Sequence, residues 1–283
     1  MEFYGNAIMG LSQEVGTVFE WRDAPAADFA VIGDPIKHSA SPRMHQAAYR
    51  ALGLPYRYVA LRVESGEVCE ALDHLRTLGY RGVNVTLPHK NEVLDWVSEV
   101  DEFAARVHSI NTVRLSDRYG FNTDAPGFMD TLRQLAVPPG TPTLLLGAGG
   151  SARALAAILS DEMYPLRIWN RTPGKAQALI DDLEIDAAAW DSPDITGAGL
   201  VVNATSSSLR GETLPIDWSL AAPGVLAYDI AYRLSPNPFL DQAEAHGIRN
   251  TDGSAMLVMQ GALAFEFWLE VDAPHEAMWE AVR

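Results

Sequence analysis

The stretch LLLGAGGSARALAAIL, residues 144–159, constrains the fold of this chain more than any other feature. An apolar run typical of a buried strand ends in a glycine-rich turn, and an alanine-rich segment with helical spacing follows. Gly147 and Gly149 would let the backbone approach a phosphate closely, and Gly150 opens a helix whose N-terminus favours negative charge. Strand, glycine turn and helix in this order meet the structural condition for a dinucleotide-binding loop, and a tight turn without a ligand is the weaker alternative.

The rest of the chain alternates strand-like and helix-like segments, which indicates an α/β sheet. Its 283 residues, 48% of them hydrophobic, reach the length at which a single core tends to split into two domains. We expect an N-terminal extension at 1–28, a first domain from 29–127 plus 255–283, and a dinucleotide-binding domain at 128–254. The helical segment within 255–271 should pack back onto the first domain. Further strands are expected at 29–35, 56–63, 82–87, 166–172, 200–207 and 225–232, and helices at 41–52 and 66–79.

Charge and cysteine content exclude several classes of function. Against 21 basic residues stand 37 acidic ones, and the formal charge of −16 argues against nucleic-acid binding or a polybasic membrane patch. An anionic ligand must therefore be held by local basic groups and backbone amides. The single cysteine, Cys69, excludes an intramolecular disulfide and a multi-cysteine metal site. With no signal-like start or long apolar run, we expect a soluble cytoplasmic protein without a metal.

The stretch GVNVTLPHK, residues 82–90, places the ammonium group of Lys90 at the end of an expected strand. Val83 and Val85 alternate as in a strand with one covered face, and Pro88 removes a backbone donor. We expect Lys90 to begin a helix at the carboxyl edge of the sheet, where open α/β sheets bind their ligands. The alternative is an ordinary solvated surface lysine.

Other polar groups also follow expected elements. Ser39 and Ser41 lie on a loop after a strand, and two hydroxyls two residues apart on an extended segment could grip a carboxylate. Serines are common in loops, so this pair alone carries little weight. Asn111 and Asp124 stand in two further turn-like segments. Together with Lys90, these groups suit a small polyhydroxylated acid.

The stretch NRTPGK, residues 170–175, bears on the choice of cofactor. An NAD site usually offers an acidic residue after the second strand to bond the ribose hydroxyl. Here Asn170, Arg171, Thr172 and Lys175 present donors and positive charge instead, which suit a 2′-phosphate. The alternative is an ordinary turn with a solvated arginine.

Eight stretches occur in the order found in the shikimate dehydrogenase family, which this chain resembles from residue 31 to 268. The resemblance implies NADP(H)-dependent interconversion of shikimate and 3-dehydroshikimate, a step of chorismate and aromatic amino-acid biosynthesis. It also implies a substrate domain closed by C-terminal helices and a Rossmann-type NADP-binding domain. The stretches are GDPIKHSASPRMH, GVNVTLPHK, INTV, GFNTDAPGF, GAGGSARA, NRTPGK, NATS and MLVMQGALAFEFW.

Carried over residue by residue, the resemblance makes Lys90 and Asp124 the catalytic acid–base pair. It assigns the substrate carboxylate to Ser39 and Ser41. It assigns the substrate hydroxyls and reacting edge to Thr86, Asn111, Tyr232 and Gln260. On the cofactor side it implicates Gly147, Ala148, Gly149, Gly150, Ser151, Ala152, Asn170, Arg171, Thr172, Lys175, Ala204, Thr205, Ser206, Ile230, Gly253 and Met256.

Several positions depart from the family pattern. His108 and Ser109 stand where the family usually has glycine and alanine, and NATSSSL replaces NATxxGM at Ser207 and Ser208. Ala255 replaces a glycine, and NPFL replaces TPLL at 237–240. A quinate or aminoshikimate dehydrogenase, including one that uses NAD, and a non-catalytic nucleotide-binding homologue stay open as alternatives. The sequence does not decide between a monomer and a homodimer.

Overall fold

The computed structural model describes residues 17–232 and 235–283, and the chain divides into two compact units. Unit 1 comprises Met1–Thr123 and Gly261–Arg283, and unit 2 comprises Asp124–Gln260. The division thus falls at 123/124 and 260/261, where we expected domain boundaries at 127/128 and 254/255. Helix α9, Ser254–Leu269, contains the second of these divisions.

Within the described residues of unit 1, seven strands form one mixed sheet in the order β1-β3-β2-β4-β6-β7-β5. Strands β1, β3, β2 and β4 run parallel, and β6 is antiparallel to both β4 and β7. The strands are β1 Val18–Glu20, β2 Phe29–Gly33, β3 Tyr58–Arg62, β4 Gly82–Val85, β5 Glu99–Val100, β6 Thr112–Arg114 and β7 Tyr119–Phe121. The helices are α2 Ser41–Ala51, α3 Val68–Thr77, α4 Glu102–Val107 and α10 His275–Val282, with short 3₁₀ turns at Trp21–Asp23 and Glu92–Asp95.

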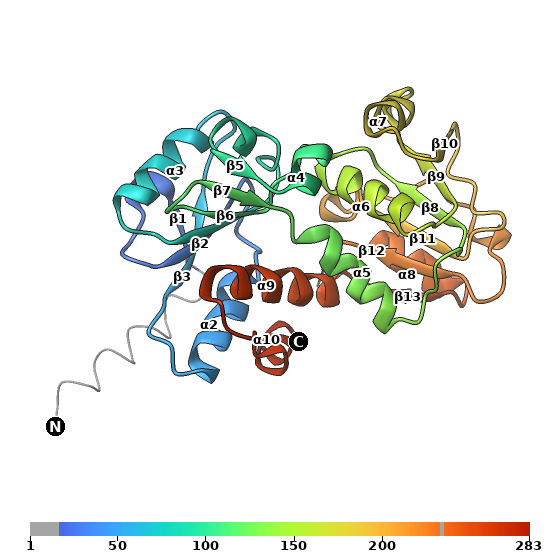
Figure 1. The fold of residues 1–283 in the computed structure, drawn as a ribbon. Coiled ribbons are helices and arrows are strands. Elements are labelled where there is room, and N and C mark those ends of the chain that lie inside the picture. Colours follow the sequence, from blue (N-terminus) through green and yellow to red (C-terminus); the bar gives the residue numbers. More distant parts are fainter. Residues whose placement is uncertain (1–16, 233–234) are drawn as a thin grey trace. The chain divides into compact units, whose positions relative to one another are not determined.

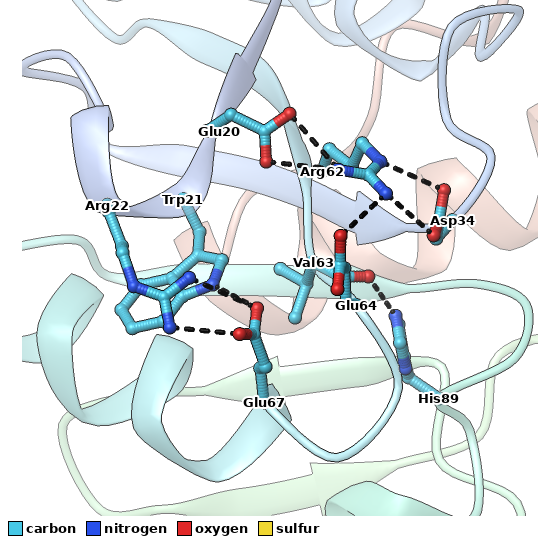
Figure 2. A network of polar contacts seen from close by, with 9 residues as sticks. All are labelled: Glu20, Trp21, Arg22, Asp34, Arg62, Val63, Glu64, Glu67 and His89. Atoms are coloured by element: carbon cyan, nitrogen blue, oxygen red, sulfur yellow. Dashed lines mark hydrogen bonds and ion pairs between the residues drawn. The ribbon is translucent and has the colours of Figure 1, made fainter.

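The described part of the expected extension at 1–28 belongs to unit 1, where β1 adds to the edge of the sheet beside β3. Trp21 is buried and donates from Nε1 to Glu67 Oε2 at 2.9 Å, and Arg22 binds the same carboxylate (Figure 2). Apolar burial and these bonds tie the segment to the unit. Residues 1–16 lie outside the described residues.

The C-terminal part of α9 packs on the sheet of unit 1, as we expected. Trp268 stacks on Phe29 with ring centroids 4.9 Å apart, and its Nε1 donates to the carbonyl of Val113 at 3.1 Å. A Cβ on Gly82 would lie 2.4 Å from Nε1 of Trp268, so only glycine lets the indole approach β4 this closely. Helix α10 packs against α2 (Figure 1).

Within the described residues of unit 2, six parallel strands form a sheet in the order β10-β9-β8-β11-β12-β13. Renumbered by position in the chain, this order is 3-2-1-4-5-6, the doubly wound order of dinucleotide-binding domains. The strands are β8 Thr143–Leu146, β9 Leu166–Trp169, β10 Ala187–Trp190, β11 Leu200–Asn203, β12 Leu226–Asp229 and β13 Arg249–Thr251. The helices are α5 Asp124–Gln134, α6 Gly150–Asp161, α7 Lys175–Leu183, α8 Pro238–Ala245 and the start of α9, with 3₁₀ turns at Ser208–Arg210 and Trp218–Leu220.

Candidate functional site

In unit 1, the segments that follow β2 and β4 leave the sheet at the same edge, because these strands are parallel neighbours. A Cβ on Gly33 would lie 2.5 Å from Cγ2 of Thr86, so glycine permits the close approach. The amide of Asp34 donates to the carbonyl of Leu87 at 2.9 Å. The fold thereby gathers the loop that carries Ser39 and the turn that follows Thr86.

Lys90 lies in a turn, and the expectation that it begins a helix is wrong. The 3₁₀ turn starts only at Glu92, and the carbonyl of Lys90 accepts the amide of Ile110 at 2.8 Å. That bond ties the turn to the segment before β6 instead of to a helical ladder. Lys90 is 8% exposed, so the reading of an ordinary solvated surface lysine is also wrong. A buried lysine at a strand end is a strong indication of function.

The turn that carries Lys90 is anchored by its neighbours. The ring of His89 is buried, and Nε2 lies 2.8 Å from the carbonyl of Val63, as Figure 2 shows. Its Nδ1 lies 3.6 Å from Oε2 of Glu92, and Glu92 accepts a hydrogen bond from Ser65 Oγ at 2.5 Å. These contacts fix the turn after β4 on the segment after β3. Sequence reasoning missed His89 and Glu92 in this role, although the LPHK motif contains the histidine.

Asn111 is held just before β6 by a buried polar network. Its Oδ1 accepts the amide of Thr123 at 2.7 Å, and its Nδ2 donates to Thr123 Oγ1 at 2.9 Å. Its carbonyl accepts the amide of Val85 at 2.8 Å, which aligns it with the end of β4. Asn111 therefore stands at the same sheet edge as Lys90. Thr123 directly precedes Asp124 in the chain.

Ser39 and Ser41 do not lie on an extended segment, so that part of the expectation is wrong. Ala40 between them is helical, with φ −87° and ψ −6°, and Ser41 is the first residue of α2. The Oγ of Ser39 is 3.3 Å from the amide of Ser41, which donates to it. The loop is held at its start by Arg62, whose Nε lies 3.2 Å from Asp34 Oδ1 (Figure 2). Whether both hydroxyls read one carboxylate stays a prediction.

Asp124 and Gln260 belong to neighbouring helices of unit 2. Asp124 is buried and begins α5, where the helix N-terminus favours a negative charge. Gly127 lies on the same face three residues later, and a Cβ on it would be 2.8 Å from the amide nitrogen of Gln260 on α9. Tyr232 follows β12 and is partly buried. Gly127 thus lets α5 pack closely against α9 at Gln260.

The glycine loop of unit 2 has the geometry of an anion-binding turn. Gly147 has φ +120°, and a Cβ on it would lie 2.9 Å from the carbonyl oxygen of Ala204. The amide of Ala204 in turn donates to Leu146 at 2.9 Å, so the ends of β8 and β11 are in contact. A Cβ on Gly149, just before α6, would meet nothing within 4 Å. Open space beside backbone amides at a helix N-terminus fits a pyrophosphate; Ala148 lies in this turn, and Gly150, Ser151 and Ala152 begin α6.

The basic turn lies after β9, at the same edge of the sheet. Asn170 Nδ2 donates to the carbonyl of Thr172 at 3.1 Å, and Lys175 is the exposed first residue of α7. The side chain of Arg171 is 76% exposed, and its Nη1 lies 3.3 Å from Oε2 of Glu212. This last contact joins residues 41 apart in the chain and was not expected from the sequence.

The loops after β11, β12 and β13 lie at the same edge of the unit 2 sheet as the basic turn after β9. A Cβ on Gly253 would lie 2.0 Å from the carbonyl oxygen of Ile230, and the amide of Gly253 donates to Ala231 at 2.9 Å. Only glycine therefore allows β13 to end against the segment after β12. Thr205 donates to Oδ1 of Asn203 at 2.7 Å, which shapes the loop that contains Ala204 and Ser206. Met256 is buried in the first turn of α9.

Asp229 is a buried carboxylate that the sequence reasoning missed. It accepts hydrogen bonds from Ser208 Oγ at 2.5 Å, Asn203 Nδ2 at 3.0 Å and Asn237 Nδ2 at 3.2 Å. Burial raises the pKa of Asp229, and these hydrogen bonds oppose the rise. Ser208 and Asn237 are two of the departures from the family pattern, and both hold the carboxylate that fixes the cofactor-side loops. The polar run after β11 was the available signal.

His108, another departure, ends α4 in the left-handed region with φ +48°. A glycine takes this conformation without cost, whereas histidine takes it with some strain. The following residue, Ser109, is buried, and its carbonyl accepts Nδ2 of Asn122 at 2.7 Å. The surrounding bonds hold the turn that leads to Asn111 despite the substitution.

Residues 17–232 and 235–283 contain neither a metal-binding cluster nor a membrane-spanning helix. In these residues no three or more His, Cys, Asp or Glu side chains form a group that could hold a metal ion. No helix among them is long and apolar enough to cross a membrane.

Comparison with known proteins gives consistent matches. The family described as "Shikimate dehydrogenase substrate binding domain" matches residues 31–113, and "Shikimate 5'-dehydrogenase C-terminal domain" matches residues 253–283. A shikimate dehydrogenase (NADP(+)) of Desulfitobacterium hafniense is 38% identical over 263 residues, which cover 90% of this chain and 96% of the relative.

Solved structures agree. The crystal structure of shikimate 5-dehydrogenase from Thermus thermophilus in complex with NADP(H) and shikimate is 38% identical, with a TM-score of 0.83 over 90% of this chain and 98% of that one. A quinate dehydrogenase from Corynebacterium glutamicum in complex with NAD is 27% identical, with a TM-score of 0.80 over 89% and 97%. Identity of this degree over nearly the whole length, together with the two-domain α/β architecture, shows that the chain belongs to the shikimate dehydrogenase family.

Proposed function

We propose that this protein catalyses the reversible NADPH-dependent reduction of 3-dehydroshikimate to shikimate. The observation that carries the proposal is a buried lysine, Lys90, fixed at the sheet edge of unit 1 among Thr86 and Asn111, in a chain that also retains Asp124. A mobile surface lysine could not serve as a positioned acid. The substrate set would comprise Ser39, Ser41, Thr86, Asn111, Tyr232 and Gln260 beside the catalytic pair.

The chemistry needs orientation and a proton more than a protein nucleophile. A bound nicotinamide supplies the hydride. In the reduction, the ammonium of Lys90 donates a proton to the carbonyl oxygen of the substrate, and in the reverse direction its amine accepts the hydroxyl proton. Asp124 orients the ammonium and the substrate hydroxyl. Ser39, in the loop after β2, and Ser41, at the start of α2, bind the carboxylate and so fix the ring for transfer.

NADP(H) is the proposed cofactor because unit 2 offers two kinds of anion site. The open backbone at Gly149 and the N-terminus of α6 fit the pyrophosphate. The exposed Arg171 and Lys175 offer positive charge for a 2′-phosphate, in a chain whose formal charge is −16. The loop at Ala204, with Ile230 and Gly253, would border the nicotinamide side.

Quinate dehydrogenase is the second candidate, since a quinate dehydrogenase crystallised with NAD is among the structural neighbours. The basic turn at Arg171 argues against NAD, because it lacks the acidic residue that bonds a free ribose hydroxyl. A non-catalytic homologue is disfavoured by the retention of both Lys90 and Asp124.

We place the enzyme in the cytoplasm, in keeping with its single cysteine. The sequence left monomer and homodimer open, and the molar mass in solution, measured by light scattering, would decide between them.

The deciding experiment is a matrix of rates, with shikimate and quinate as substrates and NADP and NAD as cofactors. Reduction of the nicotinamide is followed by its absorbance. The proposal predicts the highest specificity constant for shikimate with NADP. A higher specificity constant for quinate, or no turnover with either acid, would contradict it.

A further inference from the structure

Arg171 is not alone at the end of β9, since a second arginine reaches the same carboxylate from a different loop. Arg210 Nε lies 2.7 Å from Glu212 Oε1, and its Nη2 lies 3.0 Å from Glu212 Oε2. Arg171 Nη1 lies 3.3 Å from the same Oε2. Two guanidinium groups, one from the turn after β9 and one from the loop after β11, therefore converge on one anionic group.

The loop that presents Arg210 is built on buried groups. Ser207 and Ser208 are buried, and Ser208 is hydrogen-bonded to Asp229 at 2.5 Å. The amides of Arg210 and Glu212 both donate to the carbonyl of Ser207, at 3.0 and 2.9 Å. Arg210 Nη1 also donates to Oγ of Ser206. The exposed arginine thus projects from a fixed base at the switch point of the sheet.

The ion pairs that Arg171 and Arg210 form with Glu212 are weak enough to be replaced by an anion with more charge and more acceptor oxygens. Its side chain is 42% exposed and those of Arg171 and Arg210 are 76% and 45% exposed, and ion pairs in water are weak. A phosphate monoester carries up to two charges and three acceptor oxygens, and it matches guanidinium forks better than one carboxylate does. Two guanidinium groups against one carboxylate also leave one net positive charge for the incoming anion.

We propose that Arg210 is a second determinant of NADP preference, which binds the 2′-phosphate together with Arg171, and that Glu212 is an internal anion displaced by it. This inference rests on the proposed function and adds a residue and a competitor to its cofactor site. In the free protein, Glu212 occupies the two arginines and so lowers their affinity for the phosphate that replaces it. NAD, which lacks the phosphate, gains nothing from either arginine.

The test measures binding of 2′,5′-ADP and 5′-ADP by calorimetry at low ionic strength, so that it needs neither substrate nor turnover. Arg210→Met should raise the Kd for 2′,5′-ADP about tenfold, which corresponds to ~1.4 kcal/mol. Glu212→Gln should lower that Kd about threefold or more, since it removes the competing charge. Both variants should leave the Kd for 5′-ADP within about twofold. Arg133→Met, at an exposed arginine paired with Asp130 on α5, controls for the change in net charge.

Three other results would contradict the inference. If Arg171→Met weakens 2′,5′-ADP but Arg210→Met does not, Arg210 is only a surface partner of Glu212 and the inference fails while the proposed function stands. If Glu212→Gln weakens binding, Glu212 organises the arginines and does not compete. If the unaltered protein binds both nucleotides equally, the NADP preference fails and this inference fails with it. Thermal unfolding confirms that each variant is folded.

Discussion

The two units hold their candidate residues in different ways. In unit 1, Lys90 and Asn111 are 8% and 2% exposed and are fixed by hydrogen bonds between adjoining segments. In unit 2, Arg171 is 76% exposed and Gly149 offers only backbone beside open space. We infer that unit 1 binds the small acid through immobilised side chains. Unit 2 binds the larger dinucleotide through a helix dipole, backbone amides and surface charge. Loss of one side chain should therefore cost more in unit 1.

The largest expected effect tests the buried lysine of unit 1. Lys90→Ala should lower kcat by ~10²–10⁴-fold, because a positioned general acid typically contributes that much. The Kd for shikimate should change far less. Lys37→Ala, at an exposed lysine on the loop after β2, is the matched control and should keep nearly full turnover. Steady-state rates and equilibrium binding separate the two effects, and near-normal turnover of Lys90→Ala would remove it from the mechanism.

The next effect concerns the carboxylate of the substrate. Replacing both Ser39 and Ser41 with Ala should raise KM for shikimate roughly 10- to 100-fold, since charge-assisted hydrogen bonds contribute ~1.5–3 kcal/mol each before water replaces them. Turnover should change less. The contrast is a substrate analogue without the carboxylate. If its binding weakens equally, the serines shape the loop and do not read the acid.

The corresponding test in unit 2 adds a methyl group to Gly149, in the glycine loop that precedes α6. Gly149→Ala should leave the thermal midpoint nearly unchanged, since its Cβ meets nothing within 4 Å. It should raise the Kd for NADP about tenfold, because the methyl occupies space that a pyrophosphate would approach. Calorimetric titration with NADP gives the answer. An unchanged Kd would mean that the glycine loop is a turn without a ligand.

The last prediction is an effect on stability and concerns the core of unit 1, with a change of up to about tenfold in the folding equilibrium per pH unit. His45 is fully buried, stacks on Tyr58 with centroids 4.4 Å apart, and has no hydrogen-bond partner for either ring nitrogen among the described residues. Burial lowers the pKa of His45 to about 3. The unfolded chain takes up this proton below pH ~6.5 and the folded chain only near 3, so stability should fall as pH falls through that window, by up to about 1.4 kcal/mol per unit.

His45→Phe should remove this part of the pH dependence, as measured by urea unfolding between pH ~7 and ~4, which covers the upper part of the expected window. His38→Gln, at an exposed histidine of the same unit, serves as the control. If the acid sensitivity of His45→Phe equals that of the unaltered protein, the histidine is not the group whose protonation opens the core.

The elements that the sequence predicted are those whose signals are local, whereas the helices α4, α5, α7, α8 and α10 were not predicted. The glycine turn before α6, the proline in the first turn of α2 and the apolar runs of β2, β8 and β11 each act within a few residues. The short strands β5, β6, β7, β10 and β13 escaped prediction. They have little apolar periodicity, and they exist because neighbouring strands complete their hydrogen bonds.

By itself, the sequence determined the α/β class, the order of the elements and the residue types of the candidate site, since these depend on periodicity, turn chemistry and motif order. The tertiary structure alone decided that Lys90 is buried in a turn, that His108 adopts a left-handed conformation, and that Glu212 meets Arg171. The physical reason is strand order. Which strands become neighbours fixes which loops share a sheet edge, and a pattern read along the chain does not contain the distances between such loops.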